Sequence, residues 1–173
     1  MNTTKVLGAA PAKGADVEYQ RPLLAIYCLV LKGRELLLLK RTGTEYANGF
    51  WSVPAGHVDQ HEPLLAAASR ELEEETGLIV SQAAWSFVAL MHRQTQQRNI
   101  IDVFLKTDEF SGELTNREPD KHGALGFRDL SELPHSIVPY VKEILDRIGA
   151  GHACAAPFLL QYGWETPNEG VDS

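Results

Sequence analysis

Three glutamates in the middle of the chain have the spacing of one helical face. Glu71, Glu74 and Glu75 stand at positions i, i+3 and i+4, so in a helix their carboxylates lie on one side. Three like charges repel one another, and negative charge near a helix C-terminus also opposes the helix dipole. A hard divalent cation such as Mg²⁺ removes this conflict, because it binds carboxylate oxygens together with substrate phosphates. The spacing therefore indicates a metal site, with a solvated acidic helix face as the alternative.

The residues around these glutamates follow a longer pattern. The segment Gly56 to Leu78 fits the pattern G-x5-E-x7-R-E-U-x-E-E-x-G-U, in which U is aliphatic, at every defined position. If each fixed residue type makes up roughly 5 to 8% of an average protein, the seven fixed positions match a given start by chance about once in 10⁸ to 10⁹. This segment is a Nudix box, and the chain therefore resembles the Nudix hydrolase family, in particular its MutT-like members.

The resemblance implies a role for each charged residue of the box. Glu71, Glu74 and Glu75 look like ligands of Mg²⁺ or Mn²⁺, and Glu71 is also the favoured base for the attacking water. Arg70 is similar to the box arginine that orients these glutamates, and Glu62 occupies the box position that supports the metal site. The resemblance thus implies Glu71, Glu74 and Arg70 as the catalytic residues.

The first residue of the box and three residues outside it complete the expected site. Ala55 stands where the family usually has a glycine whose backbone carbonyl ligates the metal, and Gly56 shapes the loop beside the substrate. Arg41 ends a predicted strand, where many Nudix enzymes place a basic residue near the phosphates, and a plain surface arginine is the alternative. Glu118 is either a further metal or base residue or a turn-stabilising carboxylate before Pro119.

The stretch around Glu118 bears on the substrate. Residues 116–121 have the sequence NREPDK, which resembles the N-x-E-P-[DE]-K stretch of Nudix enzymes that act on nucleoside triphosphates. The usual continuation contains Cys, Glu and Trp, whereas this chain continues with His122. Two other histidines, His57 after the loop glycine and His92 at the end of a predicted strand, could reach a ligand, but structural or surface roles are the base expectation for isolated histidines.

Hydrophobic patterning predicts the elements that position these residues. Strands are expected over residues 23–31, 35–40, 50–54, 85–92, 100–106 and 126–130, and helices over 62–75 and 138–148. The run 23–31 is uniformly apolar, so we expect a strand buried on both faces. Trp51, Phe87 and Phe127 lie in predicted strands and are expected in the core. This order of elements predicts an α+β fold, and the resemblance implies a Nudix fold with a mixed β-sheet sandwiched between α-helices.

Length and composition predict one domain with two accessory ends. A chain of 173 residues with 44% hydrophobic and 23% charged residues is typical of a globular domain, expected here over residues 21–150. Residues 1–20 are expected to be a flexible leader without a secretory apolar segment. The tail, residues 151–173, carries the apolar run Phe158 to Trp164, which we expect to pack on the domain or on a second subunit of a homodimer. Free Cys28 and Cys154, and the lack of a membrane-length apolar run, predict a cytoplasmic protein.

The combined expectation is a metal-dependent pyrophosphohydrolase that cleaves a phosphoanhydride bond in a nucleoside diphosphate derivative. A nucleoside triphosphate, or its damaged form, is the first expected substrate, and a nucleoside-diphosphate sugar or ADP-ribose is the alternative. The formal charge of −7 argues against a nucleic-acid partner and disfavours transcript decapping. A non-catalytic nucleotide-sensing module is a remote alternative, because every box carboxylate is intact.

Overall fold

The fold is built on one large mixed sheet. The computed structural model describes residues 21–43, 46–149 and 156–164. Within these ranges an eight-stranded sheet has the order β10-β6-β7-β1-β2-β3, with β4 paired to β1 and β9 paired to β2. Its strands are β1 (Leu23–Lys32), β2 (Glu35–Arg41), β3 (Trp51–Ser52), β4 (Ala55–His57), β6 (Ser86–Gln94), β7 (Asn99–Thr107), β9 (His122–Asp129) and β10 (Phe158–Tyr162). A separate pair is formed by β5 (Leu78–Ile79) and β8 (Ser111–Gly112), and η1 (Gln82–Ala84) is a short 3-10 helix.

The first strand lies at the centre of this sheet and is buried on both faces. β1 pairs in parallel with β7 and antiparallel with β2 and β4. Successive residues of β1 alternate between two hydrophobic clusters: Ala25, Tyr27 and Leu29 belong to one, and Ile26 and Cys28 belong to the other. The prediction from its uniformly apolar sequence is therefore confirmed.

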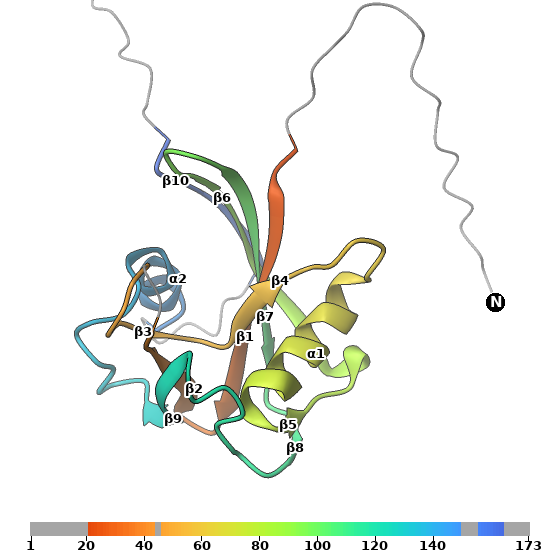
Figure 1. The fold of residues 1–173 in the computed structure, drawn as a ribbon, viewed down its shortest axis with the longest axis vertical. Helices are drawn as coiled ribbons and strands as arrows, with labels where there is room; N and C mark the ends of the chain where they lie inside the picture. The colour runs from red at the N-terminus through yellow and green to blue at the C-terminus, as the bar shows by residue number, and fades with distance from the viewer. Residues whose placement is uncertain (1–20, 44–45, 150–155, 165–173) are drawn as a thin grey trace, which may run out of the picture.

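The two helices cover opposite faces of the sheet (Figure 1). Helix α1 (Leu64–Thr76) buries Ala67, Ala68 and Leu72 in the cluster that contains Cys28. Helix α2 (Pro139–Gly149) contributes Val141 and other apolar residues to the cluster on the other face. This arrangement confirms the expected α+β fold with a mixed sheet between helices.

Several expected boundaries differ from the structure. Helix α1 begins at Leu64, because Pro63 is its N-cap with an extended backbone, and Glu62 therefore lies outside the helix. The expected strand 50–54 is instead the two-residue β3, followed by β4. Phe87 is 45% exposed, so its expected core position is wrong. The register between β6 and β7 shifts between Phe87 and Ala89, which leaves Val88 buried and Phe87 facing outward.

The expected core positions of the other two aromatic residues are partly confirmed. Trp51 and Phe127 are partly buried, and each packs against one of the two hydrophobic clusters. The thiol of Cys28 is fully buried and contacts the carbonyl oxygen of Ala68 at 3.5 Å. Burial raises the pKa of this thiol well above its ordinary value, as expected for an inert core cysteine.

The end of the chain adds an edge strand. β10 pairs in parallel with β6, and the indole nitrogen of Trp164 donates a hydrogen bond to the carbonyl oxygen of His92 at 2.9 Å. The apolar run in the tail thus packs on this domain. The expected leader, residues 1–20, and Cys154 lie outside the described residues. No helix within the described ranges is long and apolar enough to cross a membrane.

Candidate active site

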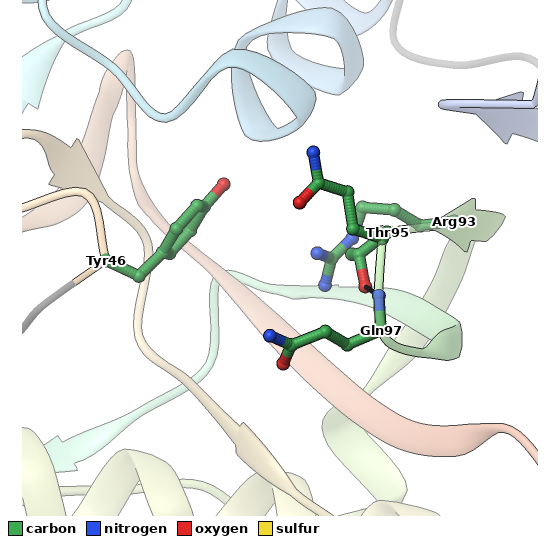
Figure 2. Close-up of a pocket in the computed structure, with 5 residues that line it drawn as sticks. Tyr46, Arg93, Thr95 and Gln97 are labelled. Carbon is green, nitrogen blue, oxygen red and sulfur yellow. Dashed lines mark hydrogen bonds between the residues drawn. The ribbon is translucent and has the colours of Figure 1, made fainter.

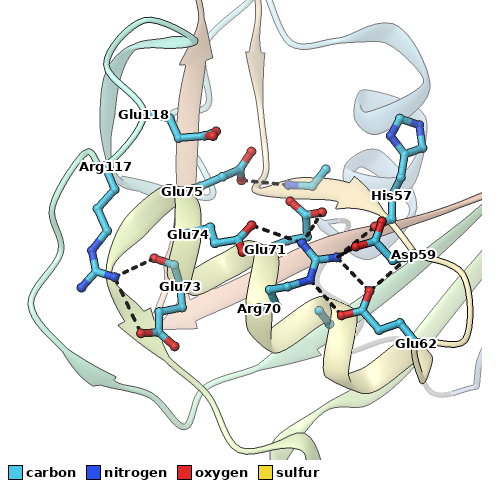
Figure 3. A network of polar contacts seen from close by, with 12 residues as sticks. His57, Asp59, Glu62, Arg70, Glu71, Glu73, Glu74, Glu75, Arg117 and Glu118 are labelled. Carbon is cyan, nitrogen blue, oxygen red and sulfur yellow. Dashed lines mark hydrogen bonds and ion pairs between the residues drawn. The ribbon is translucent and has the colours of Figure 1, made fainter.

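Arg70 holds the acidic face of α1 together (Figure 3). Its guanidinium forms two hydrogen bonds of 2.8 Å with the carboxylate of Glu62. The same group donates to Glu71 at 2.9 Å and to Glu74 at 3.2 Å. It also donates to the carbonyl oxygen of His57 at 3.2 Å. One arginine thus connects the loop before the helix to two of the three glutamates on the helical face.

These contacts change the acidity of the groups that make them. The hydrogen bonds from Arg70 lower the pKa of Glu62 from its ordinary value to about 2. The hydrogen bond with Glu62 raises the pKa of Arg70 above its ordinary value. Part of the repulsion along the glutamate face is therefore offset by an arginine on the same helix.

Glu75 is in a different environment, because its carboxylate is buried. One oxygen, Oε2, accepts a hydrogen bond from the backbone N–H of Ala55 at 3.1 Å. Burial raises the pKa of Glu75 to about 8, and the neighbouring carboxylates of Glu71 and Glu118 also raise it. A cation beside this buried carboxylate would stabilise its charged form further.

The glycine that opens the box makes room for Glu71. A Cβ atom on Gly56 would lie 1.9 Å from the carboxyl carbon of Glu71, so any side chain at this position would displace the Glu71 carboxylate. Ala55, where the family usually has glycine, lies in β4 and is not among the described residues with positive φ. Its methyl group therefore causes no backbone strain.

A loop after β8 brings two further groups to Glu75. The backbone N–H of Arg117 donates to the carbonyl oxygen of Glu75 at 3.2 Å, and its guanidinium donates to the carbonyl oxygen of Glu73 at 3.3 Å. These bonds fix the loop on the C-terminal end of α1. Glu118 and His122 then lie beside Glu75, and one ligand atom from each of the three residues lies within 4.8 Å of the others.

These elements enclose a polar cavity of about 370 Å³. Its lining combines acidic, basic and imidazole side chains with the backbone of β4, and the full set is Arg41, Ala55, Gly56, His57, Asp59, Glu71, Glu75, Glu118, Lys121 and His122. The structure therefore brings together six of the residues predicted from the sequence. Glu62, Arg70 and Glu74 lie beside this set rather than in its lining, and they are joined to it through the Arg70 contacts to Glu71 and His57.

Sequence reasoning missed Asp59, Lys121 and His122 as members of the site. Asp59 lies at a variable position of the box, and its side-chain oxygen lies 4.0 Å from Nη2 of Arg70. His122 was visible only as a departure from the usual sequence after the NREPDK stretch. His92, by contrast, contacts Asn99 at 2.7 Å, and its ring packs against the Trp164 ring in a tilted arrangement, which fits the structural role expected for it.

The donor set of the cavity fits a divalent cation. Carboxylate oxygens suit Mg²⁺ and Mn²⁺, and the imidazole of His122 suits transition metals. Among the described residues, Nδ1 of His122 is the one buried side-chain nitrogen or oxygen without a hydrogen-bond partner. The positive charges of Arg41 and Lys121 on the same cavity favour an anionic substrate.

A second cavity, of about 380 Å³, lies beside the turn between β6 and β7. Its lining is formed by Tyr46, Arg93, Thr95, Gln96 and Gln97. Figure 2 shows the Tyr46 ring facing the polar side chains of the β6–β7 turn. The side chain of Arg41, which lines the first cavity, donates from Nε to the carbonyl oxygen of Tyr46 at 3.3 Å, so one segment contributes to both cavities.

Arg93 is held rigidly at the second cavity. Its Nη2 donates to Oδ1 of the fully buried Asp102 at 3.0 Å, and its guanidinium lies 4.1 Å from the centre of the Tyr140 ring. An arginine fixed by a carboxylate and an aromatic ring is pre-organised for a polar ligand.

Comparisons with known proteins agree with this arrangement. The NUDIX domain model matches residues 21–148. The ADP-ribose pyrophosphatase of Methanocaldococcus jannaschii is 29% identical over 128 residues, which cover 74% of each chain. The m7GpppN-mRNA hydrolase NUDT17 of Xenopus laevis is 50% identical over 78 residues, which span 45% of this chain and 25% of that protein.

A solved structure of a Nudix hydrolase has a similar fold. The MutT NUDIX hydrolase from Burkholderia pseudomallei superposes with a TM-score of 0.69 at 27% identity and covers 75% of this chain and 99% of its own. The family match over most of the chain, the intact box and the metal-compatible cavity all lead to one conclusion. The chain belongs to the NUDIX family and is a Nudix hydrolase.

Proposed function

We propose that this chain is a metal-dependent pyrophosphohydrolase that hydrolyses a phosphoanhydride bond in a small nucleoside diphosphate derivative. The observation that carries the proposal is the cavity in which Glu71, Glu75 and Glu118 lie beside Arg41 and Lys121. The carboxylates would bind the metal ion, and the cations would bind phosphate oxygens. A nucleotide with two or more linked phosphates matches both requirements.

Each residue of the site has a separate role in the proposed reaction. Bound Mg²⁺ or Mn²⁺ would neutralise phosphate charge and lower the pKa of a bound water. Glu71 takes the proton from the attacking water, whose oxygen forms a bond to phosphorus as the anhydride P–O bond breaks and the phosphate group leaves. Glu75 and Glu74 act as metal ligands, while Arg70, itself fixed by Glu62, positions Glu71 and Glu74. Arg41 binds the phosphates beside the backbone of Ala55 and Gly56.

A nucleoside triphosphate, intact or damaged, is the first substrate class. Residues 116–121 resemble the corresponding stretch of Nudix enzymes that act on triphosphates, and Glu118 of that stretch lines the same cavity as the box glutamates. The part of the substrate that does not react would occupy the second cavity, where the Tyr46 ring can stack on a base and Gln97 can bind its polar edge.

ADP-ribose, or another nucleoside-diphosphate sugar, is the second candidate. It is supported by the Methanocaldococcus jannaschii relative, which is named an ADP-ribose pyrophosphatase and matches 74% of this chain. The Xenopus laevis relative is named an mRNA hydrolase, but the formal charge of −7 disfavours an RNA substrate for this chain.

The test is product release from a panel of purified compounds, with Mg²⁺, with Mn²⁺ and with a chelator. The panel contains nucleoside triphosphates, oxidised triphosphates, nucleotide sugars and ADP-ribose. Metal-dependent turnover of a triphosphate supports the first substrate class, and preference for ADP-ribose or a sugar conjugate supports the second. Binding of a nucleotide without turnover of any compound would overturn the enzyme proposal in favour of a nucleotide-sensing module.

A further inference from the structure

The imidazole of His122 is buried in the active-site cavity with few protein partners. The residue is only 4% exposed, although it lines the cavity. Its Nδ1 has no hydrogen-bond partner, and its Nε2 has one long contact of 3.5 Å to Oε1 of Glu75. Nε2 is therefore the nitrogen that faces the carboxylates, and it has no short hydrogen bond to the protein. This nitrogen can bind a ligand other than a protein side chain.

The neighbours of His122 are arranged as metal ligands. Its donor atom lies within 4.8 Å of a carboxylate oxygen of Glu75 and of Glu118. Glu75 already uses Oε2 to accept the Ala55 N–H, and Oε1 is the oxygen that faces His122. Glu118 uses Oε1 for its ion pair with Lys121 at 2.6 Å, and its second oxygen forms no hydrogen bond or ion pair with the described residues. The three side chains come from α1, from the loop and from the start of β9.

The chemistry of this donor set differs from that of carboxylates alone. Mg²⁺ prefers oxygen ligands and retains water molecules, so an imidazole adds little to its binding. First-row transition metals accept imidazole nitrogen together with carboxylate oxygen, and their affinities for such mixed sites are higher. A histidine among the carboxylates would therefore change which ion binds.

We propose that Glu75, Glu118 and His122 form a metal subsite with one nitrogen ligand, which binds a transition-metal dication such as Mn²⁺ or Co²⁺ in preference to Mg²⁺. The subsite deepens the proposed function, since it shares Glu75 with the Nudix box, and it assigns His122 a role that the box residues do not supply. His57 lines the same cavity but is exposed and is not part of the three-residue group, which makes it a matched control.

The test is pulsed electron paramagnetic resonance of Mn²⁺ bound to the full chain without substrate. The wild-type spectrum is expected to show modulation from a directly bound ¹⁴N nucleus. His122→Gln should lose this modulation, whereas His57→Gln should keep it. Absence of the modulation in wild-type protein, or its loss only in His57→Gln, would overturn the proposal.

Binding affinities give a second measurement of the same subsite. By calorimetry, wild-type protein should bind Mn²⁺ more tightly than Mg²⁺, and His122→Gln should weaken Mn²⁺ binding by about tenfold or more while weakening Mg²⁺ binding less. Equal losses of affinity for Mn²⁺ and Mg²⁺ would contradict the proposal that the His122 nitrogen favours Mn²⁺. If His122→Gln fails to fold, the His57→Gln protein labelled with ¹⁵N-histidine tests the same subsite, because His122 is then the one histidine left in the described cavity lining. The modulation should shift from the ¹⁴N to the ¹⁵N frequency, and an unshifted modulation would overturn the proposal.

These measurements are independent of turnover. Absence of the nitrogen signal from wild-type protein would remove His122 from the metal site, but it would not contradict the proposal of Mg²⁺-dependent hydrolysis. If no compound in the substrate panel is hydrolysed, the hydrolase proposal is overturned. The Mn²⁺ spectrum still shows whether His122 binds the metal.

Discussion

At the residue scale, the site depends on how charges of one sign are kept close together. Arg70 contacts Glu62, Glu71 and Glu74 at once, so these three carboxylates are oriented by one guanidinium. Glu75 has no such partner and is buried. The same helical face therefore contains carboxylates stabilised by arginine and one carboxylate that a cation would stabilise.

Replacing Arg70 by lysine tests its positioning role. Lysine keeps the charge but cannot form the two parallel bonds to Glu62 or reach Glu71 and Glu74 together. We expect Arg70→Lys to lower kcat by about 10- to 100-fold, the range typical of residues that orient metal ligands, and to raise the pKa of Glu62 toward its ordinary value. Steady-state kinetics and NMR titration measure the two effects.

The control for this substitution is Arg147→Lys, because Arg147 forms an exposed pair with Glu143 on α2, away from the cavity. It should leave kcat unchanged. Wild-type turnover in Arg70→Lys would contradict the positioning role.

The buried Glu75 predicts a pH dependence of stability in the metal-free protein. Its pKa of about 8 in the folded state lies above the ordinary value of 4.5, so the folded protein binds this proton more tightly than the unfolded chain. The free energy of unfolding should therefore fall as pH rises from about 5 to about 8 and then level off. Urea unfolding with a chelator present measures this slope.

Two comparisons isolate the contribution of Glu75. Glu75→Gln should have a flatter pH profile than wild type, because its side chain does not titrate. Addition of Mg²⁺ should also flatten the wild-type profile, since metal binding displaces the proton. The same slope in Glu75→Gln as in wild type would show that another group is responsible.

At the element scale, the sequence predicted the elements whose patterns are local. The apolar run of β1 and the periodic spacing of α1 and α2 are visible in single segments, and each appears in the structure within a few residues of its expected bounds. Elements defined by distant partners were less predictable. β3 has two residues and exists because Lys40 pairs with Trp51, and the outward position of Phe87 results from a register shift.

Strand β10 is an element whose contribution to stability can be measured. Phe158, Leu160 and Tyr162 are partly buried against the core, and their burial contributes about 3 kcal/mol in total. A chain ending at Pro157 should lose roughly that amount of unfolding free energy, measured by urea denaturation. A chain ending at Trp164 retains β10 and is the control. Equal stability of the chain ending at Pro157 and the wild type would contradict this role.

At the scale of the whole molecule, the site is assembled from segments that the sequence does not connect. The Nudix box predicted Glu71 and Glu75 as site residues, and the resemblance of residues 116–121 to other Nudix enzymes indicated Glu118. The loop that carries Glu118 also brings His122 to Glu75, although 46 residues separate the two in the sequence, from 76 to 121. No sequence pattern identified that contact, because it depends on the docking of the loop on the end of α1.

A buried ion pair links the sheet to the second cavity. Arg93 is 8% exposed and Asp102 is fully buried. Asp102→Ala leaves a buried charge without its partner, so we expect a loss of about 3–5 kcal/mol in unfolding free energy. Asp146→Ala, which breaks the exposed pair with Lys142, should cost at most about 1 kcal/mol. Similar losses of unfolding free energy in the two variants would show that burial does not determine the contribution of Asp102 to stability.

The most direct test of the central claim compares three glutamates on one helix. Glu71 and Glu75 line the cavity, whereas Glu73 faces away from it and pairs with Arg117. With Mg²⁺ and the best substrate of the panel, Glu71→Gln and Glu75→Gln should each lower kcat by about 10²- to 10⁴-fold, and Glu73→Gln should retain nearly full turnover. Full metal-dependent turnover in Glu71→Gln or Glu75→Gln would contradict hydrolysis in this cavity.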